Sequence, residues 1–158
     1  MRTKLILLFL FPITLVFNSY GQKAMSFKKA EMQGRSFQHL DSLYKSAIHS
    51  NVNLAVFKSQ EEQAELQKSY TGLFKELGAF LKLNCFEWAK PTRCFNRLYF
   101  NPKGEIDYFL YNFSENQIVP EKEKEFERLL NLFVKDYKFP LKANQNFAQC
   151  SPIKYTDF

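Results

Sequence analysis

The period of the hydrophobic pattern changes partway along the chain, and this change constrains the fold more than any other feature. Residues 66–81 place apolar side chains at helical spacing, whereas residues 94–100 and 106–111 are β-prone and partly alternate. A third helical stretch follows Pro120, because proline suits the first turn of a helix. The sequence therefore predicts a mixed α+β fold, in a chain whose 158 residues suit one domain.

Two helices are predicted before the strands, in a helical part that covers residues 36–82. Apolar residues recur at helical spacing over residues 36–50, and a second helix begins after Ser59. Ser59 and Glu62 have the spacing of a capping box, in which each side chain binds the backbone amide of the other residue. The second helix is therefore expected to have a well-defined start.

Three strands are predicted in the second half of the chain. Asn101–Gly104 is typical of a turn, and it joins residues 94–100 to residues 106–111 in a β-hairpin. A last strand is expected at residues 147–155, and Pro152 inside it indicates a sheet edge because proline cannot donate to a ladder. The predicted fold is two N-terminal helices followed by a β-β-α-β unit with a three-stranded antiparallel sheet.

Residues 1–21 have the pattern of a cleaved signal peptide. A positively charged start precedes the apolar run Leu5–Phe17, and small residues precede the cleavage position after Gly21. The rival interpretation, an uncleaved membrane anchor, needs about 20 apolar residues, which this run does not supply. We expect a periplasmic or secreted bacterial protein, with a flexible lead at residues 22–35, a single domain at residues 36–158 and no membrane span after signal removal.

Composition argues against several kinds of chemistry. The five glycines are scattered, so neither kind of glycine-rich nucleotide loop is present, and His39 and His49 are the two histidines of the chain. Once Arg2 and Lys4 leave with the signal, 20 basic residues face 16 acidic ones, a net charge of +4 that demands no nucleic-acid partner. We therefore expect no catalytic residues, no metal site and no cofactor.

Export would place three cysteines, Cys85, Cys94 and Cys150, in an oxidising compartment where disulfides persist. The odd number leaves one thiol free or paired with another chain. Cys85–Cys94 and Cys94–Cys150 are the two candidate disulfides. Trp88 lies in the first of these loops, where it either anchors the loop to the core or contacts a partner. A secreted inhibitor or immunity-type protein acting through the Cys85–Cys94 loop is accordingly the alternative function.

Residues 94–155 resemble the C-terminal domain of the TonB and TolA energy transducers. The turn and second strand of that family are matched by Asn101-Pro102-Lys103-Gly104-Glu105-Ile106. Tyr137-Lys138-Phe139-Pro140 matches the segment after the family's helix, and Pro152-Ile153-Lys154-Tyr155 matches its closing strand. The motifs are short, but their order and spacing agree with the family over less than half of the mature chain.

The resemblance implies a binding mode. In that family the closing strand lies at the sheet edge and pairs with an extended peptide from an outer-membrane receptor, which is β-augmentation. By position, the corresponding peptide-binding residues here are Phe147, Gln149, Ser151, Ile153 and Tyr155. The chain departs from the family in its two helices at residues 36–82, which are able to cover the same edge, and in the lack of a proline-rich spacer. We expect an exported, non-catalytic module that binds a protein or peptide.

Overall fold

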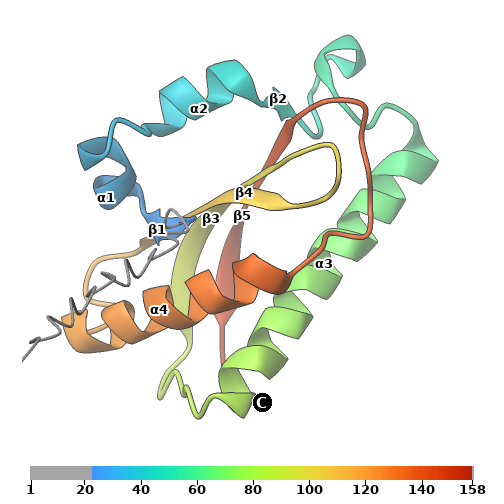
Figure 1. Cartoon of the computed structure of the whole chain (residues 1–158). Helices are drawn as coiled ribbons and strands as arrows, with labels where there is room; N and C mark the ends of the chain where they lie inside the picture. Colours follow the sequence, from blue (N-terminus) through green and yellow to red (C-terminus); the bar gives the residue numbers. More distant parts are fainter. Residues whose placement is uncertain (1–22, 158) are drawn as a thin grey trace, which may run out of the picture.

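The computed structural model describes residues 23–157, so the predicted signal peptide at residues 1–21 lies outside the described residues. Within the described residues, the short elements come first along the chain and the longer ones follow (Figure 1). In order these are β1 (Ala24–Ser26), α1 (Phe27–Met32), α2 (Phe37–Leu43), β2 (Lys45–Ser46), a 3-10 helix (Val52–Leu54), α3 (Gln60–Leu83), β3 (Thr92–Phe100), β4 (Ile106–Phe113), α4 (Pro120–Asp136) and β5 (Phe147–Tyr155).

The strands form one mixed sheet in the order β1-β4-β3-β5-β2. Its centre is antiparallel, with β3 paired to β4 on one side and to β5 on the other. The short strands β1 and β2 add to the two outer sides in parallel orientation. The fold is thus α+β, as predicted, but the described residues form five strands and four α-helices, where three strands and three helices were expected.

Helices cover both faces of this sheet (Figure 1). Leu98 and Phe109 belong to a large apolar cluster with residues of α3 and α4. Tyr99 and Leu110, the next residues along the same strands, belong to a smaller cluster with residues of α1 and α2. Because successive strand residues point to opposite faces, the two clusters lie on the two sides of the sheet. The aromatic residues of β3 and β4 therefore serve two cores.

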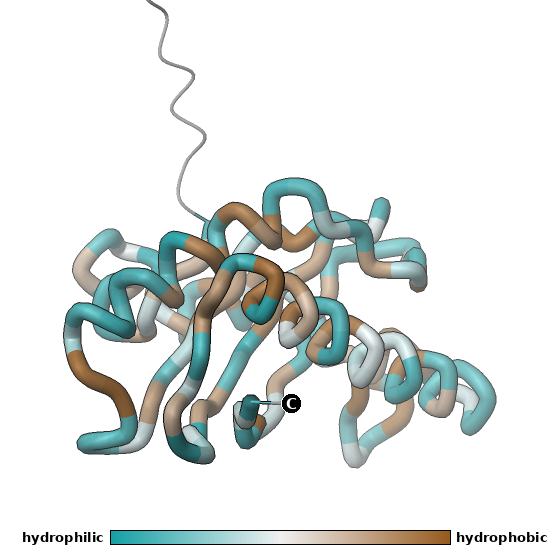
Figure 2. Tube along the Cα trace, turned by 90° about the horizontal axis from the view of Figure 1, so that it is seen from below, coloured by the Kyte–Doolittle hydropathy of each residue, from teal (hydrophilic) through white to brown (hydrophobic). Residues whose placement is uncertain are grey.

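The starts of the two long helices agree with the sequence signals. The Ser59 side chain accepts from the Glu62 amide at 3.1 Å, and the Glu62 carboxylate accepts from the Ser59 amide at 2.9 Å, so the predicted capping box is confirmed. Pro120 is the first residue of α4. Figure 2 shows hydrophobic and hydrophilic residues mixed along the helices, as expected for helices with one buried and one solvated side.

The helix predicted at residues 36–50 is wrong beyond Leu43. Tyr44 is extended, its ring lies 5.0 Å from that of Tyr99, and its hydroxyl donates to Asp107 Oδ2 at 2.9 Å. Three residues later, the Ala47 amide donates to Ala148 O at 2.8 Å, in line with the pairing of β2 to β5. Contacts with the sheet therefore override the local helical period.

The prediction of a flexible lead at residues 22–35 is wrong for residues 24–32, which form β1 and α1. The side-chain amide of Asn131, in α4, hydrogen-bonds both backbone polar groups of Ala24, as the backbone of a neighbouring strand would. Its Oδ1 accepts from the Ala24 amide at 2.9 Å, and its Nδ2 donates to Ala24 O at 2.7 Å. A side chain more than 100 residues away thus orders this segment. Because the contact is distant in sequence, the local sequence pattern did not predict it.

Candidate functional site

The two edges of β5 differ in how they are paired. One edge pairs with β3 along the whole strand, from Phe147 opposite Phe100 to Tyr155 opposite Thr92. The other edge pairs with β2 only at Phe147 and Ala148. Beyond Ala148, no strand within residues 23–157 occupies that side of β5. The edge position predicted from Pro152 therefore holds for most of the strand.

The hydrogen bonds of β2 show which backbone groups face the open edge. Ala148 O accepts from the Ala47 amide, so the peptide groups of Ala148 point away from β3. Because this direction alternates along an antiparallel pair, the groups of Cys150, Pro152 and Lys154 also point outward. Proline has no N–H, so the edge offers two amides and three carbonyls. The Gln149 side chain already donates to one of these carbonyls, Cys150 O, at 3.3 Å.

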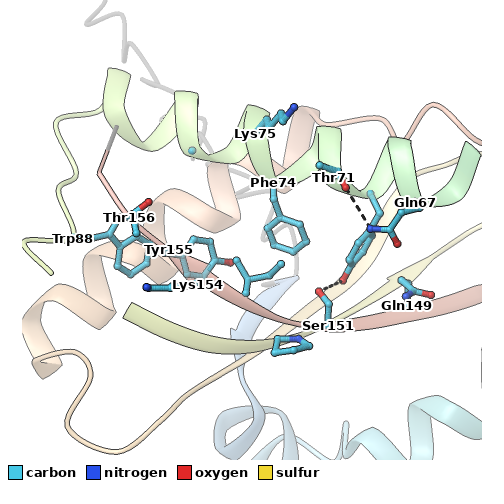
Figure 3. A pocket seen from close by; sticks show the side chains of 14 residues that line it. Gln67, Thr71, Phe74, Lys75, Trp88, Gln149, Ser151, Lys154, Tyr155 and Thr156 are labelled. Atoms are coloured by element: carbon cyan, nitrogen blue, oxygen red, sulfur yellow. Dashed lines mark hydrogen bonds between the residues drawn. The ribbon is translucent and has the colours of Figure 1, made fainter. Parts of the chain in front are cut away.

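A groove of about 390 Å³ lies between this open edge and α3 (Figure 3). Its volume falls in the range of roughly 300–1,000 Å³ typical of ligand pockets. One wall is a face of α3, and the other is the outer half of β5. The lining residues are Gln67, Tyr70, Thr71, Phe74, Lys75 and Gly78 from α3, Trp88 from the following loop, and Gln149, Ser151, Pro152, Ile153, Lys154, Tyr155 and Thr156.

Aromatic rings form the base of the groove. Phe74 projects from α3 toward β5, and its ring centroid lies 5.2 Å from that of Tyr70 and 6.3 Å from that of Tyr155 (Figure 3). Trp88 stacks on Tyr155 with their centroids 4.6 Å apart. Phe74 is only half-buried, whereas Tyr70, Trp88 and Tyr155 are buried. The groove therefore presents one partly exposed ring above a floor of buried aromatic side chains.

The two tyrosines of the floor stay neutral. Burial raises the pKa of Tyr70 and of Tyr155 above the ordinary value for a phenol. Ser151 Oγ donates to the Tyr70 hydroxyl at 3.3 Å, and the Tyr155 hydroxyl donates to Asn96 Oδ1 at 3.1 Å. Neither phenol is thus a base at neutral pH, and both act as hydrogen-bonding supports for the strand.

The structure separates the five predicted peptide-binding residues into two groups. Gln149, Ser151 and Ile153 line the groove, and each is partly exposed. Phe147 is fully buried against Phe57 and Phe100, so it is a core residue and not a contact for a partner. Tyr155 also lines the groove but is 6% exposed, as part of its floor.

Sequence reasoning missed the α3 wall. Its aromatic members belong to an apolar stripe at helical spacing, which is the ordinary signal of a core-facing helix. Leu66, Leu73 and Leu77 are indeed buried, but Phe74, on the flank of the stripe, is not. The sequence contained no signal that set Phe74 apart, because the stripe has the width that is ordinary for a helix with one core-facing side.

All three cysteines are free thiols in the structure. Cys94 is buried in the cluster on the α3 and α4 side of the sheet. Cys150 follows Ala148 by two residues and so faces the opposite side, where Ala148 packs. Bonding Cys94 to Cys150 would require the backbone to move, because their Cβ atoms point apart. Cys85 is exposed just after α3, whereas Cys94 is buried. The Cys85–Cys94 pairing stays a prediction.

Trp88 anchors its loop to the core, which was one of its two predicted roles. It is 6% exposed, and its ring also contacts Phe86 and Phe126. Asp157 fixes the loop from the other end of the chain, because its carboxylate accepts from the amides of Trp88 at 2.7 Å and of Ala89 at 3.0 Å. The indole is thus not available to a partner.

The described residues contain no group of three or more His, Cys, Asp or Glu side chains able to hold a metal ion. Between residues 23 and 157, no helix combines the length and the apolar character needed to cross a membrane. Comparison with protein-family models, with curated proteins and with solved structures found no match. Any assignment of function therefore depends on the groove itself.

Proposed function

We propose that this protein is exported to the periplasm or the cell exterior and binds an extended segment of another protein as a sixth strand beside β5. The observation that carries the proposal is the open edge from Cys150 to Lys154, which faces a groove bordered by α3. An unpaired edge of this kind is a template for an added strand. The activity is binding without catalysis.

Main-chain hydrogen bonds supply the affinity of recognition, and side-chain contacts select the register. The outward amides and carbonyls of β5 bind the backbone of the incoming segment, and this supplies affinity with little dependence on its sequence. Every second side chain of the segment then points toward α3, where Thr71 and Phe74 form the wall. These contacts select the register, because a shift of one residue turns the other set of side chains toward the wall.

The resemblance to TonB and TolA C-terminal domains supports the same strand as the binding element. The helices at residues 36–82, which were able to cover that edge, do so only in part. β2 occupies the edge at Phe147 and Ala148, and α3 borders the remaining edge without filling the groove. An outer-membrane-associated partner is the proposal that this resemblance adds.

A proline at position 150 tests the proposal. Cys150→Pro removes one outward amide and leaves the bonds between β5 and β3 in place, so we expect binding to weaken about tenfold. The ligand is an extended hexapeptide, acetyl-Thr-Val-Gln-Gln-Val-Thr-amide, titrated into the mature protein and followed by NMR amide shifts. The matched control is Cys150→Ala, which keeps the amide and should bind as the wild type does.

The choice of position decides whether this experiment is informative. Gln149 lies in the same strand, but its amide points to β3, so a proline there would break the sheet itself. Equal binding by Cys150→Pro and Cys150→Ala, with both variants folded, would contradict strand addition.

A further inference from the structure

We infer that the segment bound at β5 is acidic, with carboxylates on both of its faces; this rests on the proposed function. Two lysines lie at the rim of the groove: Lys154 on β5, and Lys75 on α3, whose side chain extends from the side of the helix away from β5 (Figure 3). Among the described residues that line the groove, none is an aspartate or a glutamate. The site thus carries positive charge that its own walls do not neutralise.

Some cations of the protein, such as Arg97 and Lys29, form ion pairs with its own carboxylates. Arg97 Nη2 lies 2.7 Å from Asp41 Oδ2, and Lys29 Nζ lies 2.5 Å from Glu127 Oε1. Lys75 and Lys154 are exposed, and neither forms an ion pair with any residue between 23 and 157. Uncompensated charge at the rim of a binding site favours ligands of the opposite sign and speeds their association.

The two lysines lie on opposite faces of the position where a sixth strand would fit. Lys75 is on α3, which packs against one face of the sheet. Lys154 is an even-numbered residue of β5, and its side chain shares the opposite face with Ala148. Because neighbouring residues of a strand point to alternate faces, two consecutive acidic residues would point to the two faces, one on the side of Lys75 and one on the side of Lys154.

A second copy of the same chain fits this edge less well than an acidic segment does. Pairing β5 with β5 of another molecule would bring the lysines of two grooves together, with no carboxylate among the described lining residues to separate them. Like charges facing each other across an interface oppose such pairing. Self-association is therefore an outcome that the test must distinguish.

The test compares three hexapeptides of one design by NMR titration of the mature protein. Acetyl-Thr-Val-Glu-Glu-Val-Thr-amide is expected to bind about three- to tenfold more tightly than the Gln-Gln peptide, and the Lys-Lys peptide more weakly than either. The advantage should shrink as salt rises from 20 mM to 500 mM, because both lysines are exposed. In the double variant Lys75→Gln with Lys154→Gln, the Glu-Glu and Gln-Gln peptides should bind equally.

Lys68→Gln is the matched control, because Lys68 is an exposed lysine on α3 that does not line the groove. It should preserve the preference for the acidic peptide. Equal affinity of the Glu-Glu and Gln-Gln peptides for the wild type would overturn the acidic preference and leave strand addition standing. If no peptide shifts the Cys150 and Lys154 amides, both proposals fall. A concentration-dependent dimer with these amides protected would instead assign the edge to a second copy.

Discussion

Replacing Trp88 with alanine is expected to lower the free energy of unfolding by about 3–5 kcal/mol, the usual cost of deleting a fully packed aromatic side chain. The indole joins parts of the chain that are distant in sequence. It stacks on Tyr155 at the end of β5 and lies 5.3 Å, between centroids, from Phe126 of α4. Its removal leaves a cavity where three elements meet, and the surrounding rings cannot close it without moving β5.

Urea denaturation followed by circular dichroism measures this loss. Trp88→Phe keeps an aromatic ring at the site and should cost clearly less than Trp88→Ala. The same pair of variants tests the alternative function through the Cys85–Cys94 loop. A contact residue of an inhibitory loop can be truncated at little cost in stability, so a loss below about 1 kcal/mol would contradict the anchoring role.

Gly104→Ala is the second substitution with a large expected effect, about 2–4 kcal/mol of destabilisation. Gly104 has a φ of +82°, a conformation that favours glycine. A Cβ atom at this position would also clash with the backbone carbonyl of Phe139. The clash cannot relax locally, because the Phe139 amide donates to Gly104 O at 2.8 Å and holds the two segments together.

Gly72→Ala is the matched control for this substitution. Gly72 lies inside α3, and a Cβ atom there meets nothing within 4 Å. Alanine favours helix over glycine by about 1 kcal/mol, so this variant should be as stable as the wild type or more stable. Thermal and urea unfolding of both variants give the comparison. Equal stability of Gly104→Ala and the wild type would show that the turn does not pack as described.

The elements that sequence predicts well are those whose signals are local. Ser59 and Glu62 define the start of α3 because capping involves neighbouring residues, and Gly104 marks the hairpin turn for the same reason. β1 and β2 contain three and two residues, too few to show a period. Their positions depend on distant partners, such as Asn131 for β1, and a single sequence contains no record of such contacts.

The candidate site was also predicted only in part: its β5 wall was predicted, and its α3 wall was not. Pro152 predicts an edge strand, and Gln149, Ser151 and Ile153, which the resemblance assigned to peptide binding, do line the groove. The opposite wall was not predicted, because Phe74 resembles any other member of a buried stripe. Only the placement of α3 beside β5, fixed by packing over the whole domain, makes that residue part of a binding surface.

Hydrogen exchange at the open edge of β5 tests the central claim most directly. In the free protein, the Cys150 and Lys154 amides should exchange quickly, whereas those of Ser151 and Ile153, which point to β3, should be protected. Saturating acetyl-Thr-Val-Glu-Glu-Val-Thr-amide should slow exchange at Cys150 and Lys154 by about tenfold or more and leave the other two unchanged. Unaltered exchange at both positions with the peptide bound, or full protection without it, would contradict strand addition at β5.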